Sequence, residues 1–408
     1  MRHVVFCIPF FRETTLRFVR GVAALPGVRL GLVTQDPKEL LPADIAGAIA
    51  AHYRVEDALD PEHLLRGVQA IAKPLDGRID RLVGTLEQLQ VPLGYVRDRL
   101  GIEGMGEETA KNFRDKSRMK SVLRAAGVPC ARHRLCTNAN EAASFCALVG
   151  FPVVAKPPAG AGAKATFRID GLAALEEALD AVPPTPERPI LYEEFVRGTE
   201  HSFDAVNIGP NTVWHSLTRY EPTPLHVLET SWVQWTVHLP REVDHPRYDD
   251  IRAIAGKALK TLGMGSGVSH MEWFRRADGT IAISEVGARP PGAQICSLVS
   301  YAHEIDFYGA WGRLVVFDEF DKPERRYSAG CAYLRGQGSG GRIKAIHGIE
   351  QAQREVGELV VEARMPQVGA EASGTYEGEG YVIVRHAASD VVATALKRLV
   401  TLIKVELG

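Results

Sequence analysis

A lysine followed by a loop of small residues lies near the middle of the chain. Lys156 ends the apolar run that begins at Val153, and the segment 157–164 reads Pro-Pro-Ala-Gly-Ala-Gly-Ala-Lys. Small side chains let backbone N–H groups approach phosphate oxygens, and a lysine adds a positive charge. No Gly-Lys-Ser/Thr leads into a helix, so the segment is not a Walker loop. The pattern favours phosphate binding, with a glycine-rich hairpin linker as the alternative.

Two glutamates and an arginine follow on a predicted hairpin. One strand, from Val268 to Phe274, carries Glu272, and the next carries Glu285, with Arg289 after it. If the strands pair, Glu272 and Glu285 converge on one face, where they repel each other unless a cation lies between them. Magnesium prefers a few carboxylates together with phosphate oxygens and water. Arg289 could hold a carboxylate or stabilise a transferring phosphoryl group, although a surface hairpin with a structural arginine has the same pattern.

Two weaker segments lie upstream of the hairpin. The strand Ile190 to Val196 breaks at Gly198, and Glu200 follows. A broken strand can present backbone groups to an adenine edge, with a carboxylate further on for ribose hydroxyls. The basic segment from Asn112 to Lys120 is predicted to be helical. Taken alone, each segment is more typical of a solvated surface.

The spacing of apolar residues predicts the elements that position these groups. Strand and helix signals alternate over the first hundred residues and predict βαβ units around a parallel sheet. One helix is predicted from Glu107 to Ala126, ended by Gly127. Antiparallel strands are predicted after Glu200. The predicted fold class is therefore α/β and α+β, with modules over 1–110, 111–200, 201–327 and 328–408.

Bulk composition narrows the class of protein. The chain has 408 residues, of which 45% are hydrophobic and 24% charged, so a disordered chain is excluded. The formal net charge of -2 with mixed signs predicts no nucleic-acid partner. No apolar run reaches the roughly 18 residues of a membrane helix, so no membrane partner is expected. The expected location is the cytoplasm, and homodimerisation stays open.

The order of the motifs resembles the ATP-grasp superfamily. Asp115-Lys116 precedes a Gly-Val-Pro; the strand lysine and loop come next, then Glu-Glu-Phe-Val-x-Gly-x-Glu, and last Glu…Glu-x-x-x-Arg, all within about 115–290. The likeness is nearest to the amino-acid ligase and biotin carboxylase-like branches of the carboxylate–amine ligases. It implies an N-terminal βαβ preATP-grasp domain (1–110), a small ATP-clamping subdomain (111–200), a core with the metal hairpin (201–327) and a C-terminal lid-side subdomain (328–408).

The resemblance also implies roles for particular residues. It assigns ATP binding to Lys116, Lys156, Gly160, Gly162, Lys164, Glu193, Glu194, Val196 and Glu200. It assigns Mg²⁺, with Mn²⁺ as an alternative, to Glu272 and Glu285. Arg289 would bind the substrate carboxylate or an acyl-phosphate and, with Lys156, would be catalytic. Gly287 departs from the family pattern, which usually has asparagine there.

The stretch between the broken strand and the hairpin is the predicted pocket for the second substrate. It contains His226, Glu229 and Trp232, which together with Arg289 would contact that substrate. Tryptophans in such a stretch can shape an apolar side-chain site, but they also pack in sheet cores. The first interpretation predicts that these side chains face a cavity.

The implied function is an ATP-dependent carboxylate–amine ligase that forms ADP. The γ-phosphate of ATP would activate a carboxylate as an acyl-phosphate, and an amine would attack it to form an amide or peptide bond. The partners are small-molecule carboxylate and amine substrates, with an amino acid favoured. The alternatives are a purine-pathway ligase, a biotin carboxylase-like enzyme and a non-catalytic nucleotide-binding protein, the last suggested by Gly287.

Overall fold

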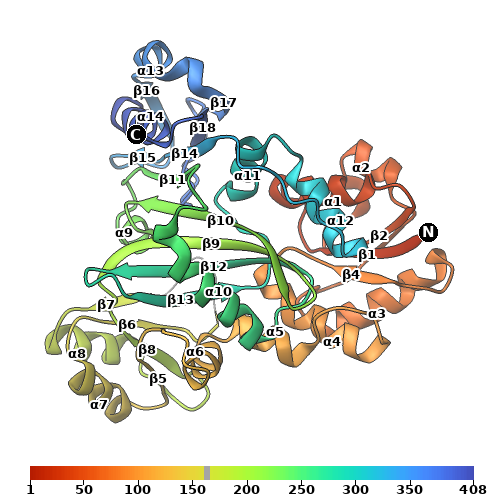
Figure 1. Cartoon of the computed structure of the whole chain (residues 1–408), viewed down its shortest axis with the longest axis horizontal. Coiled ribbons are helices and arrows are strands. Elements are labelled where there is room, and N and C mark those ends of the chain that lie inside the picture. The colour runs from red at the N-terminus through yellow and green to blue at the C-terminus, as the bar shows by residue number, and fades with distance from the viewer. Residues whose placement is uncertain (160–165) are drawn as a thin grey trace.

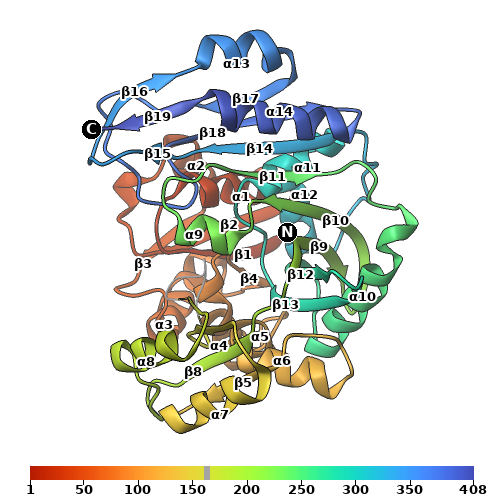
Figure 2. The same cartoon turned by 90° about the vertical axis from the view of Figure 1, so that its left-hand side faces the viewer.

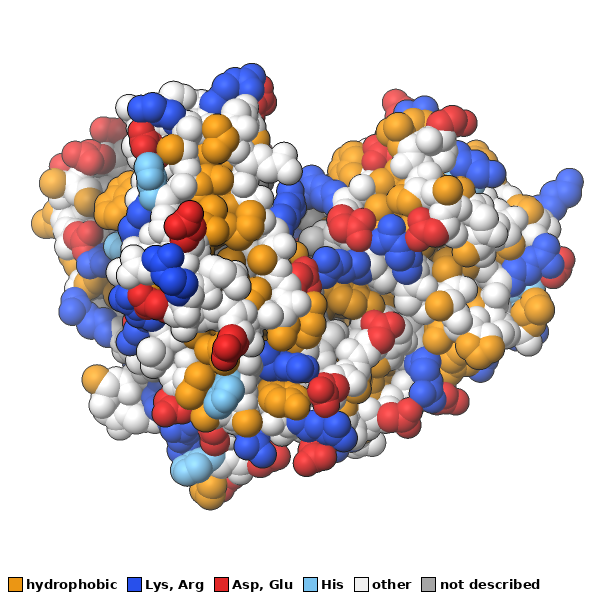
Figure 3. Space-filling view, turned by 90° about the horizontal axis from the view of Figure 1, so that it is seen from above, with side chains coloured by type: hydrophobic (Ala, Val, Ile, Leu, Met, Phe, Trp, Pro, Cys, Tyr) orange, Lys and Arg blue, Asp and Glu red, His pale blue; other side chains and the backbone are white. Residues whose placement is uncertain are grey.

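The computed structural model of the protein describes residues 1–159 and 166–408. In this described part the strands form four sheets, arranged in Figure 1 as a small lobe, an N-terminal domain and a C-terminal module around a central sheet. On the face seen in Figure 3, acidic and basic side chains are interspersed and a hollow separates two lobes. Among the described residues, no helix is long and apolar enough to cross a membrane.

The N-terminal domain is built on a parallel sheet. Its strands are β1 (Arg2–Ile8), β2 (Val28–Thr34), β3 (Ala51–Arg54) and β4 (Arg81–Val83), in the order β3-β2-β1-β4. The connecting helices are α1 (Glu13–Ala23), α2 (Ala43–Ala48), α3 (Pro61–Ala72) and α4 (Gln90–Leu100). Val4 to Ile8 of β1 are buried because helices cover both faces of the sheet. The predicted βαβ arrangement is confirmed.

The single helix predicted over Glu107 to Ala126 is in fact two helices. They are α5 (Glu107–Arg114) and α6 (Lys116–Ala125), and Asp115 between them has extended backbone angles. The Asp115 carboxylate accepts hydrogen bonds from the N–H groups of Ser117 and Arg118, and such a cap starts a new helix. The break directs the Lys116 N–H to the carbonyl of Pro158, 2.8 Å away, at the start of the small-residue loop.

The small lobe is an antiparallel sheet with helices on one face. Its strands run in the order β5-β8-β6-β7, with β5 at His133–Cys136, β6 at Val153–Lys156, β7 at Phe167–Ile169 and β8 at Ile190–Glu194. The helices α7 (Ala139–Val149) and α8 (Leu172–Ala181) contribute Phe145 and Leu175 to its core. Lys156 and Glu193 therefore lie on neighbouring strands.

The central sheet has eight strands and extends into the C-terminal module. Its order is β13-β12-β9-β10-β11-β14-β18-β17. The bounds are β9 Gly198–Ile208, β10 Asn211–Glu221, β11 Trp235–Leu239, β12 Gly267–Arg276, β13 Ile281–Gly287, β14 Ser328–Leu334, β17 Val360–Arg364 and β18 Gly380–His386. Because β11 pairs with β14, a division at 327/328 crosses a single sheet.

Helices cover both faces of the central sheet. On one face α10 (Asp249–Leu262) packs with α6, and on the other α11 (Ile295–His303) and α12 (Phe307–Phe317) join the sheet to α1. Figure 2 shows α14 (Ser389–Leu402) lying along the C-terminal strands. The remaining C-terminal elements are α13 (Ile349–Val356), β15 (Gly336–Gln337), β16 (Ile343–His347) and β19 (Lys404–Leu407). The short helix α9 (Pro224–Glu229) connects β10 to β11.

Candidate active site

A cavity of about 550 Å³ lies between the small lobe and the β12–β13 hairpin. Every predicted module contributes to its wall: Glu87 from 1–110, Lys156 from 111–200, Glu272 from 201–327 and Tyr376 from 328–408. The wall also contains Lys116, Glu193, Glu194, Val196, Glu200, Glu285 and Arg289. The structure thus brings most of the predicted site residues to one place.

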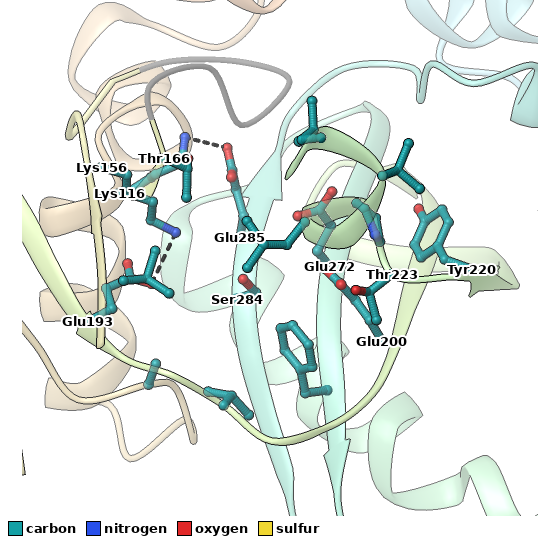
Figure 4. A pocket seen from close by; sticks show the side chains of 18 of the residues that line it. Lys116, Lys156, Thr166, Glu193, Glu200, Tyr220, Thr223, Glu272, Ser284 and Glu285 are labelled. Atoms are coloured by element: carbon teal, nitrogen blue, oxygen red, sulfur yellow. Dashed lines mark ion pairs between the residues drawn. The ribbon is translucent and has the colours of Figure 1, made fainter. Parts of the chain in front are cut away.

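One end of the cavity is built on a buried carboxylate between two lysines. Glu193 is 4% exposed, and its carboxylate oxygens lie 3.0 Å from Lys156 Nζ and 3.4 Å from Lys120 Nζ. Burial raises the pKa of Glu193, but the two lysines lower it by more, so its pKa is below the ordinary value. Glu193 lines the cavity, and its carboxylate holds the amine of Lys156 at the cavity wall (Figure 4).

Lys120 contacts the residues of this site, although no sequence motif assigned it a role. Its side chain is fully buried and donates to the carbonyl of Ser284 on β13, 2.6 Å away, as well as pairing with Glu193. It therefore ties the small lobe to the β12–β13 hairpin. The signal in the sequence is its spacing, because Lys116 and Lys120 are four residues apart and share one face of α6.

The predicted convergence of Glu272 and Glu285 is present. The two residues are direct partners in the β12–β13 register, and both side chains point into the cavity (Figure 4). Lys116 Nζ lies 2.7 Å from Glu285 Oε1, so the first residue of α6 also reaches the hairpin.

A histidine behind Glu272 is held by a buried aspartate. His270 Nδ1 lies 2.6 Å from Asp204 Oδ1, and its Nε2 lies 3.8 Å from Glu272 Oε1. Burial lowers the pKa of His270, but Asp204 and Glu272 raise it more, to about 9. The charged imidazole helps to orient Glu272 toward the cavity.

The carboxylates of the hairpin region fit a divalent cation. Burial raises the pKa of Glu200, and the negative charge of Glu272 raises it further, to about 8. Among the described residues, no group of three or more His, Cys, Asp or Glu side chains is arranged to hold a metal ion. Two carboxylates completed by phosphate oxygens and water are the ligands that Mg²⁺ prefers.

The broken strand between β8 and β9 forms the cavity edge. Glu194 pairs with Arg132 and, at 2.7 Å, with Arg276 on β12, so its side chain fastens the small lobe to the central sheet. A Cβ at Gly198 would collide with the carbonyl oxygen of Arg275, which requires glycine where the chain crosses to β9. Val196 and Glu200 lie on the cavity wall.

The predicted phosphate loop is only partly described. Gly160, Gly162 and Lys164 lie outside the described residues. The flanking residues Pro157 and Thr166 both line the cavity, so the loop starts and ends at its wall.

The other end of the cavity holds Arg289 and a carboxylate from the N-terminal domain. Arg289 Nε lies 2.5 Å from Glu87 Oε2, and Glu87 is 7% exposed. A Cβ at Gly287 would lie 3.1 Å from the same Glu87 oxygen. Glycine at 287, where the family usually has asparagine, therefore leaves room for Glu87. No motif in the sequence pointed to Glu87.

Three of the four predicted second-substrate residues do not line the cavity. These are His226, Glu229 and Trp232, of which Trp232 is 58% exposed, whereas Arg289 does line it. In α9 the apolar residues Leu225, Val227 and Leu228 line the cavity, while His226 and Glu229 on the other side of the helix are exposed.

The wall next to α9 is apolar and is closed by the C-terminal module. Trp235, Ile295 and Tyr376 complete it, and Trp235 Nε1 donates to the carbonyl of Tyr376 over 2.8 Å. Trp235 also stacks on Tyr333, with ring centroids 4.3 Å apart. Of the two tryptophans in the stretch predicted to form the second-substrate pocket, Trp235 lines the cavity and Trp232 does not.

Residues 121–300 match the family model described as ATP-grasp domain. This part of the chain is therefore an ATP-grasp domain, as the order of the motifs predicted.

Similar proteins include ligases of several kinds. The chain is 23% identical over 315 residues to the L-arginine-specific L-amino acid ligase of Bacillus subtilis, covering 76% of this chain and 75% of that protein. It is 24% identical over 353 residues to the uncharacterized protein y4rH of Sinorhizobium fredii, covering 84% and 71%.

Solved structures share the whole fold. The L-amino acid ligase of Bacillus licheniformis superposes with a TM-score of 0.77 at 18% identity, over 100% of this chain and 99% of that chain. The N5-carboxyaminoimidazole ribonucleotide synthetase of Thermotoga maritima gives a TM-score of 0.71 at 19% identity, over 100% of both chains.

Proposed function

We propose that the protein is an ATP-dependent, ADP-forming ligase that joins a carboxylate to an amine, with an amino acid as a substrate. One observation carries the proposal: a single cavity has a lysine-rich end, a pair of facing carboxylates and an arginine beside an apolar wall. These are the groups needed to bind a nucleoside triphosphate and hold a carboxylate near it. The similarity to amino-acid ligases supports the same choice.

At the lysine end, Lys156 and Lys116 would bind the phosphates of ATP. Glu193 holds Lys156 in place, and Glu285 lies 2.7 Å from Lys116. Glu272 and Glu285 would hold Mg²⁺, which supplies charge neutralisation of the phosphates when it is bound. Val196, Glu200 and the edge around Gly198 would contact the nucleoside.

Beside the proposed phosphate site, Arg289 would bind the substrate carboxylate. The carboxylate oxygen would attack the γ-phosphorus, the bond to the bridging oxygen would break, and ADP would leave. The amine would then attack the acyl carbon of the acyl-phosphate, lose a proton and expel inorganic phosphate. Every covalent change falls on the substrates, so the side chains act by positioning and electrostatics.

The shape of the acceptor end favours an amino acid with an apolar side chain. Leu225, Leu228, Trp235 and Ile295 offer apolar contacts, and Arg289 with Glu87 offers charges of both signs. An amino acid carries both charges on its α-carbon. A cytoplasmic location, where ATP is abundant, agrees with this role.

The test is the release of ADP and phosphate from Mg-ATP across the twenty amino acids, singly and in pairs. We expect release that depends on particular amino acids and a peptide or amide product by mass spectrometry. The Glu285→Gln protein is the control for contaminating ATPase. If ATP binds but no amino acid supports release, the proposal fails, and bicarbonate, formate and biotin then test the other ligase classes.

A further inference from the structure

A short segment between two strands of the central sheet forms one wall of the cavity. It covers residues 223–233, which include α9, and is called the α9 segment below. Five of its residues line the cavity: Thr223, Pro224, Leu225, Val227 and Leu228. A helix of six residues is too short to be stable by itself, so contacts with other parts of the fold must hold it against the cavity.

One side chain of the C-terminal module makes three contacts with this segment. Nη1 of Arg335, the residue after β14, donates to the carbonyl oxygens of Val227, Thr230 and Val233 over 2.7, 2.9 and 3.1 Å. Carbonyl groups at the end of a helix have no partner within it and carry negative partial charge, which a cation offsets. Arg335 therefore holds the C-terminal end of α9 and the turn that follows it.

The same side chain packs against a second segment of the cavity wall. A Cβ at Gly378 would lie 2.7 Å from Cγ of Arg335, so glycine at this position makes room for the arginine. Gly378 lies two residues after Tyr376, which lines the cavity. Arg335 is thus placed between two parts of the wall, the α9 segment and the loop that carries Tyr376.

The charge of Arg335 is directed to the α9 segment rather than to a carboxylate. The residue is 6% exposed, and in the described part of the chain it forms no ion pair with an aspartate or glutamate. Burial lowers the pKa of Arg335, and the negative charge of Glu379 offsets only part of this effect. A buried cation costs free energy unless it is hydrogen-bonded, so the three carbonyls stabilise the arginine as it holds them. Removing the arginine should therefore release the α9 segment.

We infer that Arg335 is a positioning residue that holds the α9 segment in place and thereby sets which amino-acid side chains the apolar end of the cavity accepts. This role rests on the proposed function for its substrate. Arg335 does not line the cavity, so it acts through the apolar residues of the α9 segment. The proposed phosphate ligands Lys116 and Lys156 lie on other elements, so ATP binding should not depend on Arg335.

The first experiment measures whether Arg335 holds the segment. Hydrogen exchange of the whole protein without substrates, read by mass spectrometry, reports on amides of the α9 segment, where the N–H groups of Val227, Thr230 and Val233 are hydrogen-bonded. In Arg335→Met these amides should exchange at least tenfold faster than in the parent, while amides of β12 and β13 should exchange as before. Unchanged exchange in the α9 segment would overturn the inference.

The second experiment measures substrate choice. In Arg335→Met the KM for an apolar amino acid that the parent uses should rise at least tenfold, and the preference between large and small amino acids should shrink at least threefold. The KM for ATP should change less than twofold. Arg335→Lys keeps a donor for the carbonyls, so its values should lie between those of the parent and Arg335→Met. An unchanged preference, or an equal rise in both KM values, would contradict the positioning role.

Arg97 provides the matched control. It also donates to backbone carbonyls, from Nε and Nη2 to Leu82 and from Nη1 to Met105, but it lies in the N-terminal domain outside the cavity wall. Arg97→Met should lower stability and leave the amino-acid preference unchanged. An equal shift of preference in Arg97→Met would show that general loss of stability, rather than release of the α9 segment, causes the effect.

Two further outcomes keep the test decisive. If Arg335→Met does not fold, Arg335→Lys takes its place, with at least threefold faster exchange in the α9 segment and at least a threefold rise in the KM for the amino acid; parental values would overturn the inference. If the parent releases no ADP with any amino acid, the proposed function fails, and hydrogen exchange alone decides whether Arg335 holds the α9 segment.

Discussion

The two ends of the first cavity are built in different ways. The lysine end consists of charged residues on α6, the small lobe and the hairpin: Lys116, Lys156, Glu193, Glu272 and Glu285. The apolar end draws Glu87 from the N-terminal domain, α9 from the central sheet and Tyr376 from the C-terminal module.

The difference between the two ends corresponds to two tasks: phosphate binding, which is the same for every substrate, and choice of substrate. Phosphate binding needs a fixed set of charges, and each of those charges is held by a partner or by strand pairing. Choice of substrate needs a shape, and that shape comes from segments that are remote in sequence. We therefore expect changes at the lysine end to affect every substrate equally, and changes at the apolar end to affect substrates differently.

The largest effect should come from Glu285→Gln. The change removes one of the two facing carboxylates and the 2.7 Å ion pair with Lys116, so turnover should fall by at least about 100-fold. ADP release at saturating Mg-ATP is the measurement, with Glu350→Gln on the exposed start of α13 as the control. Turnover close to that of the parent would contradict the metal assignment.

The two lysines that pair with Glu193 provide a second test of the lysine end. Lys156 lines the cavity and Lys120 does not, so Lys156→Met should raise the KM for ATP by about 10-fold or more and Lys120→Met should raise it much less. Both changes remove an ion pair from buried Glu193 and should lower the free energy of unfolding by about 1–3 kcal/mol. Urea unfolding and ATP kinetics separate the two roles. Equal KM values in both variants would refute the distinction.

At the apolar end, Arg289→Lys should reduce kcat/KM for the carboxylate substrate by about 10-fold. Lysine keeps the charge but loses the planar fork that holds two oxygens. The KM for ATP should change little because the proposed phosphate ligands, Lys116 and Lys156, are left unchanged. Arg313→Lys, at a half-exposed surface residue, is the control. A parallel loss of ATP affinity would show that the two ends are not independent.

The smallest effect tests the shape of the apolar wall. Trp235→Phe removes part of an aromatic wall and its hydrogen bond to Tyr376, and should shift the ratio of kcat/KM between large and small amino acids by about 3–10-fold. Trp232→Phe, on an exposed side chain, should leave the ratio unchanged. A shift in Trp232→Phe alone would return the pocket to the residues predicted from sequence.

The sequence predicted local features well and packing poorly. The β12–β13 hairpin was predictable because two apolar strands flank a short turn, and that pairing fixes Glu272 opposite Glu285. The break at Asp115 was not predicted, because helical periodicity continues through it and only the side-chain cap ends the first helix. Polar residues of α9 were predicted to face the pocket because spacing alone does not say which face of a short helix is buried.

The sequence by itself determined the ATP-grasp domain, the parallel N-terminal sheet and the order of the charged groups along the chain. These depend on periodicity, turns and neighbouring strands, which are set by residues close in sequence. Only the tertiary structure decided that Glu87 meets Arg289 beside Gly287 and that Lys120 supports Glu193. Those contacts join segments that are far apart in the sequence, and their geometry follows from how the packed layers fit together.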